Sequence, residues 1–198
     1  MSTRATFKNL ALLFLPIATA MIITSVGHAG LMEVSATYST RSSRIDDNNY
    51  TESQSWTGSF AWYFLEMSAL EFSYTNGLGE QSLMAVGDPG QTHYYQEVEM
   101  EGADVVLTLA SHTSFLQPFV RGGMAHLRKR IFRKDFQGDT TLYGAPVDSI
   151  VPSYGFGLNI KITEEFGIKG SYDRWQSGTN GNSSIWDDAL KAGVSWYF

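Results

Sequence analysis

Three residues of one polar segment have the types needed for nucleophilic catalysis: Ser82, Asp88 and His93. A hydroxyl, a base and a carboxylate can activate a nucleophile when the fold brings them into hydrogen-bond contact. Such residues are common in any polar loop, however, and Asp88-Pro89-Gly90 is typical of a turn. No His pair or carboxylate cluster has the spacing of a metal site. The sequence therefore assigns no catalytic residue, metal or cofactor and favours a protein that is not an enzyme.

Charged residues recur at alternate positions of otherwise apolar segments. Successive side chains of a strand point to opposite faces, so residues two apart share a face. Four acidic and four basic residues fall on the polar face in this way: Glu33, Glu71, Asp104, Asp173, Arg121, Lys161, Lys169 and Lys191. A narrow interior cannot fully hydrate such charges. We therefore expect an ion-pair network that plugs the interior.

Eight segments alternate between apolar and polar residues with a period of two. They cover residues 32–41, 55–64, 70–74, 95–110, 115–128, 154–160, 166–172 and 190–198. The links 65–68, 111–114 and 163–165 are short, whereas the links 42–54, 76–94, 129–150 and 176–187 are longer and polar. An even count of strands, joined by alternating short and long links, is the pattern of a membrane barrel. The fold class predicted is all-β: an eight-stranded antiparallel up-and-down transmembrane β-barrel.

Both ends of the chain carry a recognisable pattern. Residues 190–198 place apolar side chains on one strand face, with Lys191, Gly193 and Ser195 on the other, and the chain stops at Phe198. At the N-terminus, Arg4 and Lys8 precede an apolar run over residues 10–26 and the small residues around Ala29. This layout predicts a signal peptide over residues 1–29, cleaved after Ala29, and a barrel over residues 30–198. Cleavage after residues 18–20 and an uncleaved anchor helix are the alternatives.

The order Lys191, Gly193, Trp196, Phe198 resembles the C-terminal signal by which the barrel assembly machinery recognises outer-membrane proteins. With the eight strands and four long links, the mature chain resembles small outer-membrane barrels of the OmpA-transmembrane, opacity-protein and OmpX/Ail type. The resemblance implies a monomer in the bacterial outer membrane, with periplasmic termini and extracellular loops. It implies a non-enzymatic envelope protein whose loops serve adhesion or ligand binding.

The sequence leaves two other functions possible. A narrow pore for small solutes needs an open lumen. A lipid A-modifying enzyme is less favoured, because barrels that deacylate lipid A use a His with a Ser two residues later. Here Arg128 follows His126 at that spacing.

The link at residues 111–114 predicts a register between its two strands. A tight turn centred between His112 and Thr113 places Asp104 beside Arg121, which would form an interior salt bridge. It also places Val105 beside Val120 and Ala103 beside Gly122 on the lipid face. A one-residue slip would break the Asp104–Arg121 pair.

Basic residues gather where the fifth segment enters its loop: Arg128, Lys129, Arg130, Arg133 and Lys134. The same register places Glu97 opposite Arg128, which would extend the hairpin by a ladder of ion pairs. Alternatively, the surplus cations contact lipopolysaccharide phosphates.

Composition limits the remaining classes. Without residues 1–29 the chain has 12 basic residues against 20 acidic ones, a charge of −8, which argues against nucleic-acid binding. Cysteine is absent, so neither disulfides nor thiolate metal sites are available. The expected partners are outer-membrane lipid and lipopolysaccharide.

Overall fold

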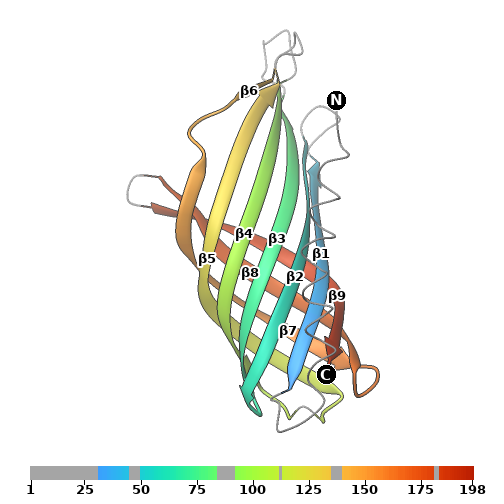
Figure 1. The fold of residues 1–198 in the computed structure, drawn as a ribbon. Helices are drawn as coiled ribbons and strands as arrows, with labels where there is room; N and C mark the ends of the chain where they lie inside the picture. The colour runs from blue at the N-terminus through green and yellow to red at the C-terminus, as the bar shows by residue number, and fades with distance from the viewer. Residues whose placement is uncertain (1–30, 45–49, 84–91, 112, 135–139, 181–182) are drawn as a thin grey trace. The chain divides into compact units, whose positions relative to one another are not determined.

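The computed structural model describes one unit, Leu31–Phe198, apart from residues 45–49, 84–91, 112, 135–139 and 181–182. The expected signal peptide and its cleavage site lie outside the described residues, as do Asp88 and His112. Nine strands make up the described part of the chain (Figure 1): β1 Met32–Arg44, β2 Tyr50–Leu65, β3 Ser68–Leu83, β4 Thr92–Thr108, β5 Leu116–Lys134, β6 Thr140–Leu142, β7 Val147–Lys161, β8 Phe166–Asn180 and β9 Ser183–Tyr197. No helix among these residues is long and apolar enough to cross a membrane.

Eight of these strands close into an antiparallel up-and-down barrel. Each long strand pairs with its neighbours in chain order, and β1 pairs with β9 to close the ring. The closure is held at its lower end by Met32 N, which donates to Phe198 O at 2.9 Å, and by the return bond from Phe198 N at 3.0 Å. The short strand β6 adds only a three-residue pairing to the outer end of β5. The predicted fold class is confirmed.

The strands are longer than the sequence pattern indicated. The ladder between β1 and β2 continues to Arg44 opposite Tyr50, and β5 extends to Lys134. The polar segments expected as four long loops are therefore largely hairpin extensions. Beyond the apolar band the outward face carries polar residues such as Glu52, Glu99 and Arg130, so the apolar–polar alternation fades there although the backbone ladder continues.

The apolar side chains cover the outer face of the barrel. Aromatic residues on this face remain well exposed, among them Trp56 at 66%, Phe72 at 51% and Phe156 at 58%. Their neighbours along each strand point inward and are buried or half-buried, as the expected alternation requires.

The register between β4 and β5 corrects the sequence prediction. Asp104 lies opposite Gly123, and Arg121 lies opposite Val106, so the ladder is displaced by two residues from the predicted one. The turn itself is where it was expected, because Ser114 N donates to Ser111 O at 2.9 Å. Leu109 N donates to Pro118 O at 2.7 Å, so the displaced register already holds where β4 ends, and the two additional residues lie between the turn and Pro118. A displacement of two leaves every side chain on its expected face but changes every partner.

Candidate functional site

The middle of the lumen holds an alternating chain of acidic and basic side chains. Lys169 Nζ lies 2.9 Å from Glu33 Oε1 and 2.9 Å from Glu71 Oε2. Glu71 also pairs with Arg121, which crosses the lumen from β5. All four side chains are at least nine-tenths buried.

The same chain continues on the other side of Arg121. The Arg121 guanidinium contacts both oxygens of Asp173, with Nε donating to Oδ1 at 2.9 Å. Asp173 Oδ2 in turn lies 3.3 Å from Lys191 Nζ. Three carboxylates and three cations thus alternate from β1 to β9, with no net charge. Because each charge has an opposite charge in contact, the chain offsets the cost of desolvating its members.

Glycines on the inner face let these side chains reach past an intervening strand. Gly155 of β7 lies opposite Arg121 on one side and Asp173 on the other. A Cβ at Gly155 would overlap Asp173 Oδ1 and lie 2.8 Å from Tyr172 O. Gly123 has the same position between Asp104 and Ser153, whose hydroxyl donates to Asp104 Oδ1 at 2.9 Å.

Two of the eight predicted interior residues are not part of the ion-pair chain. Asp104 does not form the expected pair with Arg121, because the displaced register places it opposite Gly123, and its hydrogen bond comes from Ser153 instead. Lys161 lies nearer the lower end of the barrel, with its Nζ 4.3 Å from the centre of the Tyr197 ring.

Apolar clusters lie inside the lumen on both sides of the ion pairs, a feature that the expectation of a polar interior missed. One cluster, toward the chain termini, contains Ala61, Tyr63, Ala69, Val106, Phe119 and Tyr197. The other, toward the long hairpins, contains Met100, Ala125, Leu127 and Val151, with Val98, Val147 and Trp175 packed against it. Apolar residues at inward positions, such as Tyr63 and Phe119, could have predicted these clusters. They were overlooked because the neighbouring outward positions also carry aromatic residues.

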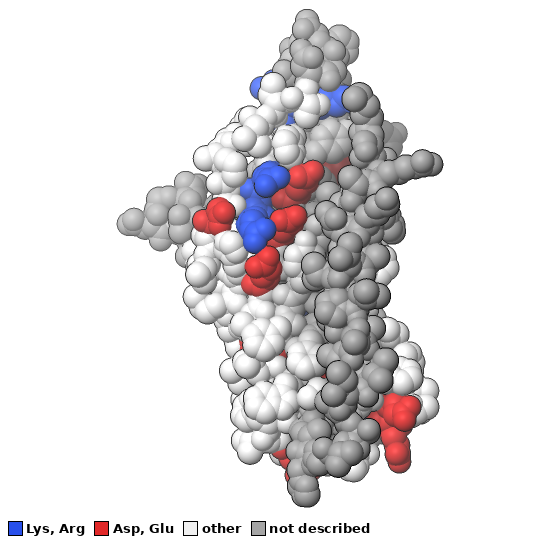
Figure 2. Space-filling view, in the orientation of Figure 1, with Lys and Arg blue, Asp and Glu red and all other residues white. Residues whose placement is uncertain are grey.

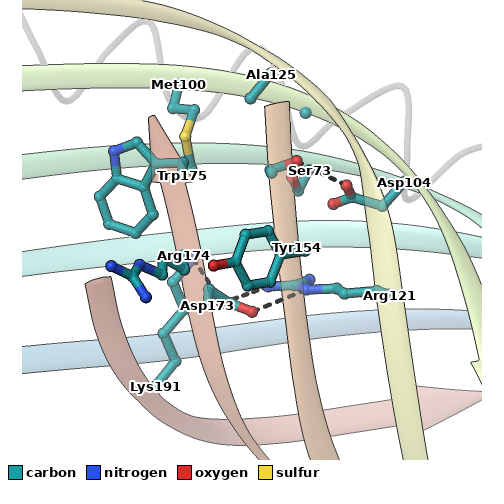
Figure 3. A pocket seen from close by; sticks show the side chains of 12 residues that line it. Ser73, Met100, Asp104, Arg121, Ala125, Tyr154, Asp173, Arg174, Trp175 and Lys191 are labelled. Carbon is teal, nitrogen blue, oxygen red and sulfur yellow. Dashed lines mark hydrogen bonds and ion pairs between the residues drawn. The ribbon is translucent and has the colours of Figure 1, made fainter. Parts of the chain in front are cut away.

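The cavities beside the ion pairs are small among the residues that the structure describes. Two small cavities flank the ion pairs, one beside Asp104, Arg121 and Asp173 and the other beside Gln117 and Tyr197. Each has room for little more than about one water molecule. Figure 3 shows the first of these, with Arg121 directed toward Asp173 across the cavity.

The C-terminal residues contribute to both faces of the closing strand. Lys191 is buried in the ion-pair chain, whereas Trp196 is half exposed on the outer face, 6.5 Å from the Phe166 ring centre. Gly193 lies at the β1 seam opposite Thr37, where an added Cβ would lie 2.6 Å from Thr37 Cα. Phe198 is also on the outer surface, at the point where β9 meets Met32.

The outer surface above the apolar band carries a mixed patch of charge (Figure 2). Arg128 contacts Glu99 at 3.3 Å and Glu101 at 2.9 Å, whereas Glu97 lies opposite Arg130 and not, as predicted, opposite Arg128. The two-residue displacement of the register is the reason.

The remaining basic residues of β5 divide between the two faces. Lys129 is half-buried on the lumen side and lies 3.5 Å from Asp187, because odd-numbered residues of this strand face inward. Arg130, Arg133 and Lys134 are exposed.

The histidines considered for catalysis contact carboxylates. His126 Nε2 lies 2.6 Å from Asp148 Oδ1, and His93 Nδ1 lies 3.5 Å from Glu80 Oε1. Ser82 lies opposite His93 in the β3–β4 ladder but is fully buried. Tyr50 donates to the same Glu80 carboxylate at 2.9 Å, and this hydrogen bond raises the pKa of the Tyr50 hydroxyl above its usual value.

Comparison with solved structures identifies the fold. The N-terminal β-barrel domain of Pseudomonas aeruginosa OprF matches at a TM-score of 0.54 and 18% identity, covering 86% of this chain and 98% of that domain. Neisserial surface protein A matches at 0.57 and 14% identity, covering 87% and 100%. The outer membrane protein OprG from Pseudomonas aeruginosa matches at 0.58 and 12% identity, covering 86% and 96%.

These neighbours are small outer-membrane β-barrels, and this chain has their eight-stranded fold. No family model matches the sequence, and no curated protein matches it.

Proposed function

We propose that this protein is an integral β-barrel of the bacterial outer membrane that does not catalyse a reaction and does not conduct solutes. In this proposal the barrel anchors hairpins on the cell surface, and the termini lie in the periplasm. The outer face supports the membrane location, because a band of exposed aromatic and aliphatic side chains in water would cause aggregation. The likeness to outer-membrane barrels of the same size supports it as well.

The observation that carries the non-conducting part of the proposal is the layered filling of the lumen. The ion-pair chain that contains Glu71, Arg121 and Lys169 lies between two apolar clusters. A hydrated ion would have to displace all three layers, and the cavities beside them have room for about one water molecule each. This arrangement favours a plugged barrel over a narrow pore.

The surface hairpins are the part of the chain available to partners. Arg130 and Lys134 have exposed, outward positions in the β4–β5 hairpin, and in the proposed orientation such cations would be available to lipopolysaccharide phosphates. Arg128 is already paired with two carboxylates and contributes less. We therefore propose lipopolysaccharide contact through the exposed cations near the end of β5, and adhesion or ligand binding through the hairpin tips.

Expression of the full chain with an epitope tag in the β1–β2 hairpin would test the membrane location. We expect the protein in the outer-membrane fraction, antibody access to the tag on intact cells, and faster electrophoretic migration without boiling than with boiling. A tag that reacts only after cell disruption would overturn the orientation. A protein with one mobility, found outside the outer-membrane fraction, would overturn the location. An unchanged lipid A mass after overexpression is expected, and a shifted mass would contradict the non-enzymatic assignment.

A further inference from the structure

The outer parts of β2, β3, β4 and β5 form a continuous sheet whose two faces differ in charge. On the outer face, part of which is visible in Figure 2, acidic side chains lie next to the basic ones of β5. The acids on this face are Glu52, Glu80, Glu97, Glu99 and Glu101. Residues two apart along a strand share a face, so the alternate positions of these strands form a second surface, which continues the wall of the lumen.

One row of this lumen-side surface carries hydrogen-bonding side chains across five neighbouring strands, from β2 to β6. Its members lie opposite one another in successive ladders: Thr51, Gln81, Tyr94, Arg133 and Thr141. The row faces inward because Tyr94 is an even number of residues away from Met100, a buried lumen residue of the same strand. Tyr94 is half-buried and the other four are exposed, so the row is accessible.

An aromatic pair borders the row at its β6 end. Tyr143 N donates to Ile131 O at 2.8 Å, which places Tyr143 in the adjoining row toward the lumen. Its ring centre lies 5.2 Å from that of Tyr94 at an interplanar angle of 70°, and 52% of Tyr143 is exposed. Arg133 belongs to β5, the strand between the two that carry these rings. An exposed aromatic ring and a guanidinium group are therefore neighbours on one face.

Arg133 gives the row its charge. Among the residues that the structure describes, no other charged side chain belongs to this row or to the adjoining row of Tyr143. Deeper on the same face, Lys129 and Asp187 lie 3.5 Å apart and offset each other. The acids of the outer face are on the far side of the sheet, where water and salt screen them from the row. The row therefore favours a ligand with a negative charge and several hydroxyl groups.

We propose that this row binds a short saccharide that carries carboxylate groups, such as a chain containing uronic acids. The Arg133 guanidinium matches a carboxylate in geometry, the Tyr143 ring offers a flat surface to a sugar ring, and the hydroxyl and amide groups of the row bond to sugar hydroxyls. Neighbouring strands are about 4.8 Å apart, so successive sugar units can contact successive strands. A single cation suits isolated carboxylates better than a densely sulfated chain. The inference gives a ligand class to the ligand binding proposed for the hairpins, and its role at the cell surface rests on that proposal.

NMR titration of the purified, folded barrel in detergent would test the site with a hexasaccharide of alternating glucuronate and N-acetylglucosamine. We expect saturable binding, and several-fold weaker binding of the same hexasaccharide after its carboxyl groups are reduced to alcohols. Arg133→Gln should weaken binding of the acidic form about tenfold, as expected for the loss of a hydrogen bond to a charged group, and leave binding of the reduced form unchanged. The matched control Arg130→Gln, exposed on the outer face of the same strand, should keep the wild-type affinity.

Two adjacent residues of similar exposure separate the faces in the same way. Tyr143→Ser should weaken binding several-fold, whereas Leu142→Ser, 50% exposed and opposite Phe132 on the outer face, should not. Heat-dependent mobility verifies that each variant is folded. Equal losses for Arg133→Gln and Arg130→Gln would overturn the proposal, as would the absence of binding by the folded wild type.

Other ligands give distinguishable outcomes in the same titration. A heparin hexasaccharide that binds more tightly than the uronate chain would overturn the assignment to isolated carboxylates. A hexaglutamate peptide that binds as tightly would overturn the assignment to a saccharide. The titration does not depend on orientation in the membrane, so a tag accessible only in disrupted cells, together with intact binding, would refute the proposed orientation and support this site.

Discussion

Replacing Arg121 by Met tests the ion-pair chain at its centre. Arg121 is 9% exposed and joins two carboxylates, Glu71 and Asp173, which are themselves buried. Removing one partner of a buried pair typically costs about 3–5 kcal/mol, because the opposite charge stays desolvated. Here Glu71 keeps Lys169 at 2.9 Å and Asp173 keeps Lys191 at 3.3 Å, so we expect a loss near the lower end, about 3 kcal/mol.

Arg128 offers a matched control on the same strand. It also contacts two carboxylates, Glu99 and Glu101, but its side chain is 39% exposed, so Arg128→Met should cost less than about 1 kcal/mol. Urea unfolding of both variants in lipid vesicles, followed by tryptophan fluorescence, gives the free energies of unfolding. A loss for Arg121→Met no larger than that for Arg128→Met would refute the assignment of the chain as the structural centre of the lumen.

Three further predictions concern particular positions. Gly155→Ala should lower the temperature at which the folded form is lost in heat-dependent electrophoresis, because the added Cβ would overlap Asp173. The control Gly122→Ala should leave this temperature unchanged, because its Cβ would meet only Ser153 O at 3.9 Å. Equal effects of the two substitutions would contradict the reasoning. Deleting Phe198 should reduce the amount of folded barrel in the outer membrane of cells, since the last residues both resemble the assembly signal and bond to Met32; undiminished assembly would count against that role. The pKa of the Tyr50 hydroxyl should lie above the usual tyrosine range in a pH series followed by ultraviolet absorbance, because its neutral form donates to Glu80. Glu80→Gln should lower the Tyr50 pKa. An unchanged titration of this variant would contradict the hydrogen bond.

The alternation of side chains was sufficient to predict the barrel and the faces of its strands. It assigned Glu33, Glu71 and Lys169 to the interior because a strand's period of two does not depend on its partners. It could not assign the partners, since those depend on register, and two residues at the start of β5 lie outside the ladder that a tight turn would give. The Asp104–Arg121 pair was wrong for this reason.

The interior glycines and apolar clusters show a second limit of sequence patterns. Gly155 marks a position where a side chain from one strand passes over the next, which is visible only when three strands are placed side by side. Phe119 and Tyr197 lie inside the lumen, where they fill the end near the short turns. An aromatic residue at an inward position carries no mark in the sequence that separates it from its outward neighbours.

Planar-bilayer recording of the purified wild-type protein tests the plugged lumen most directly. The filled interior predicts that incorporation of the folded barrel, verified by its heat-dependent mobility, produces no stable conductance steps. Uniform steps whose size increases with salt concentration would contradict the proposal and would show that ions pass the Glu71–Arg121–Asp173 layer.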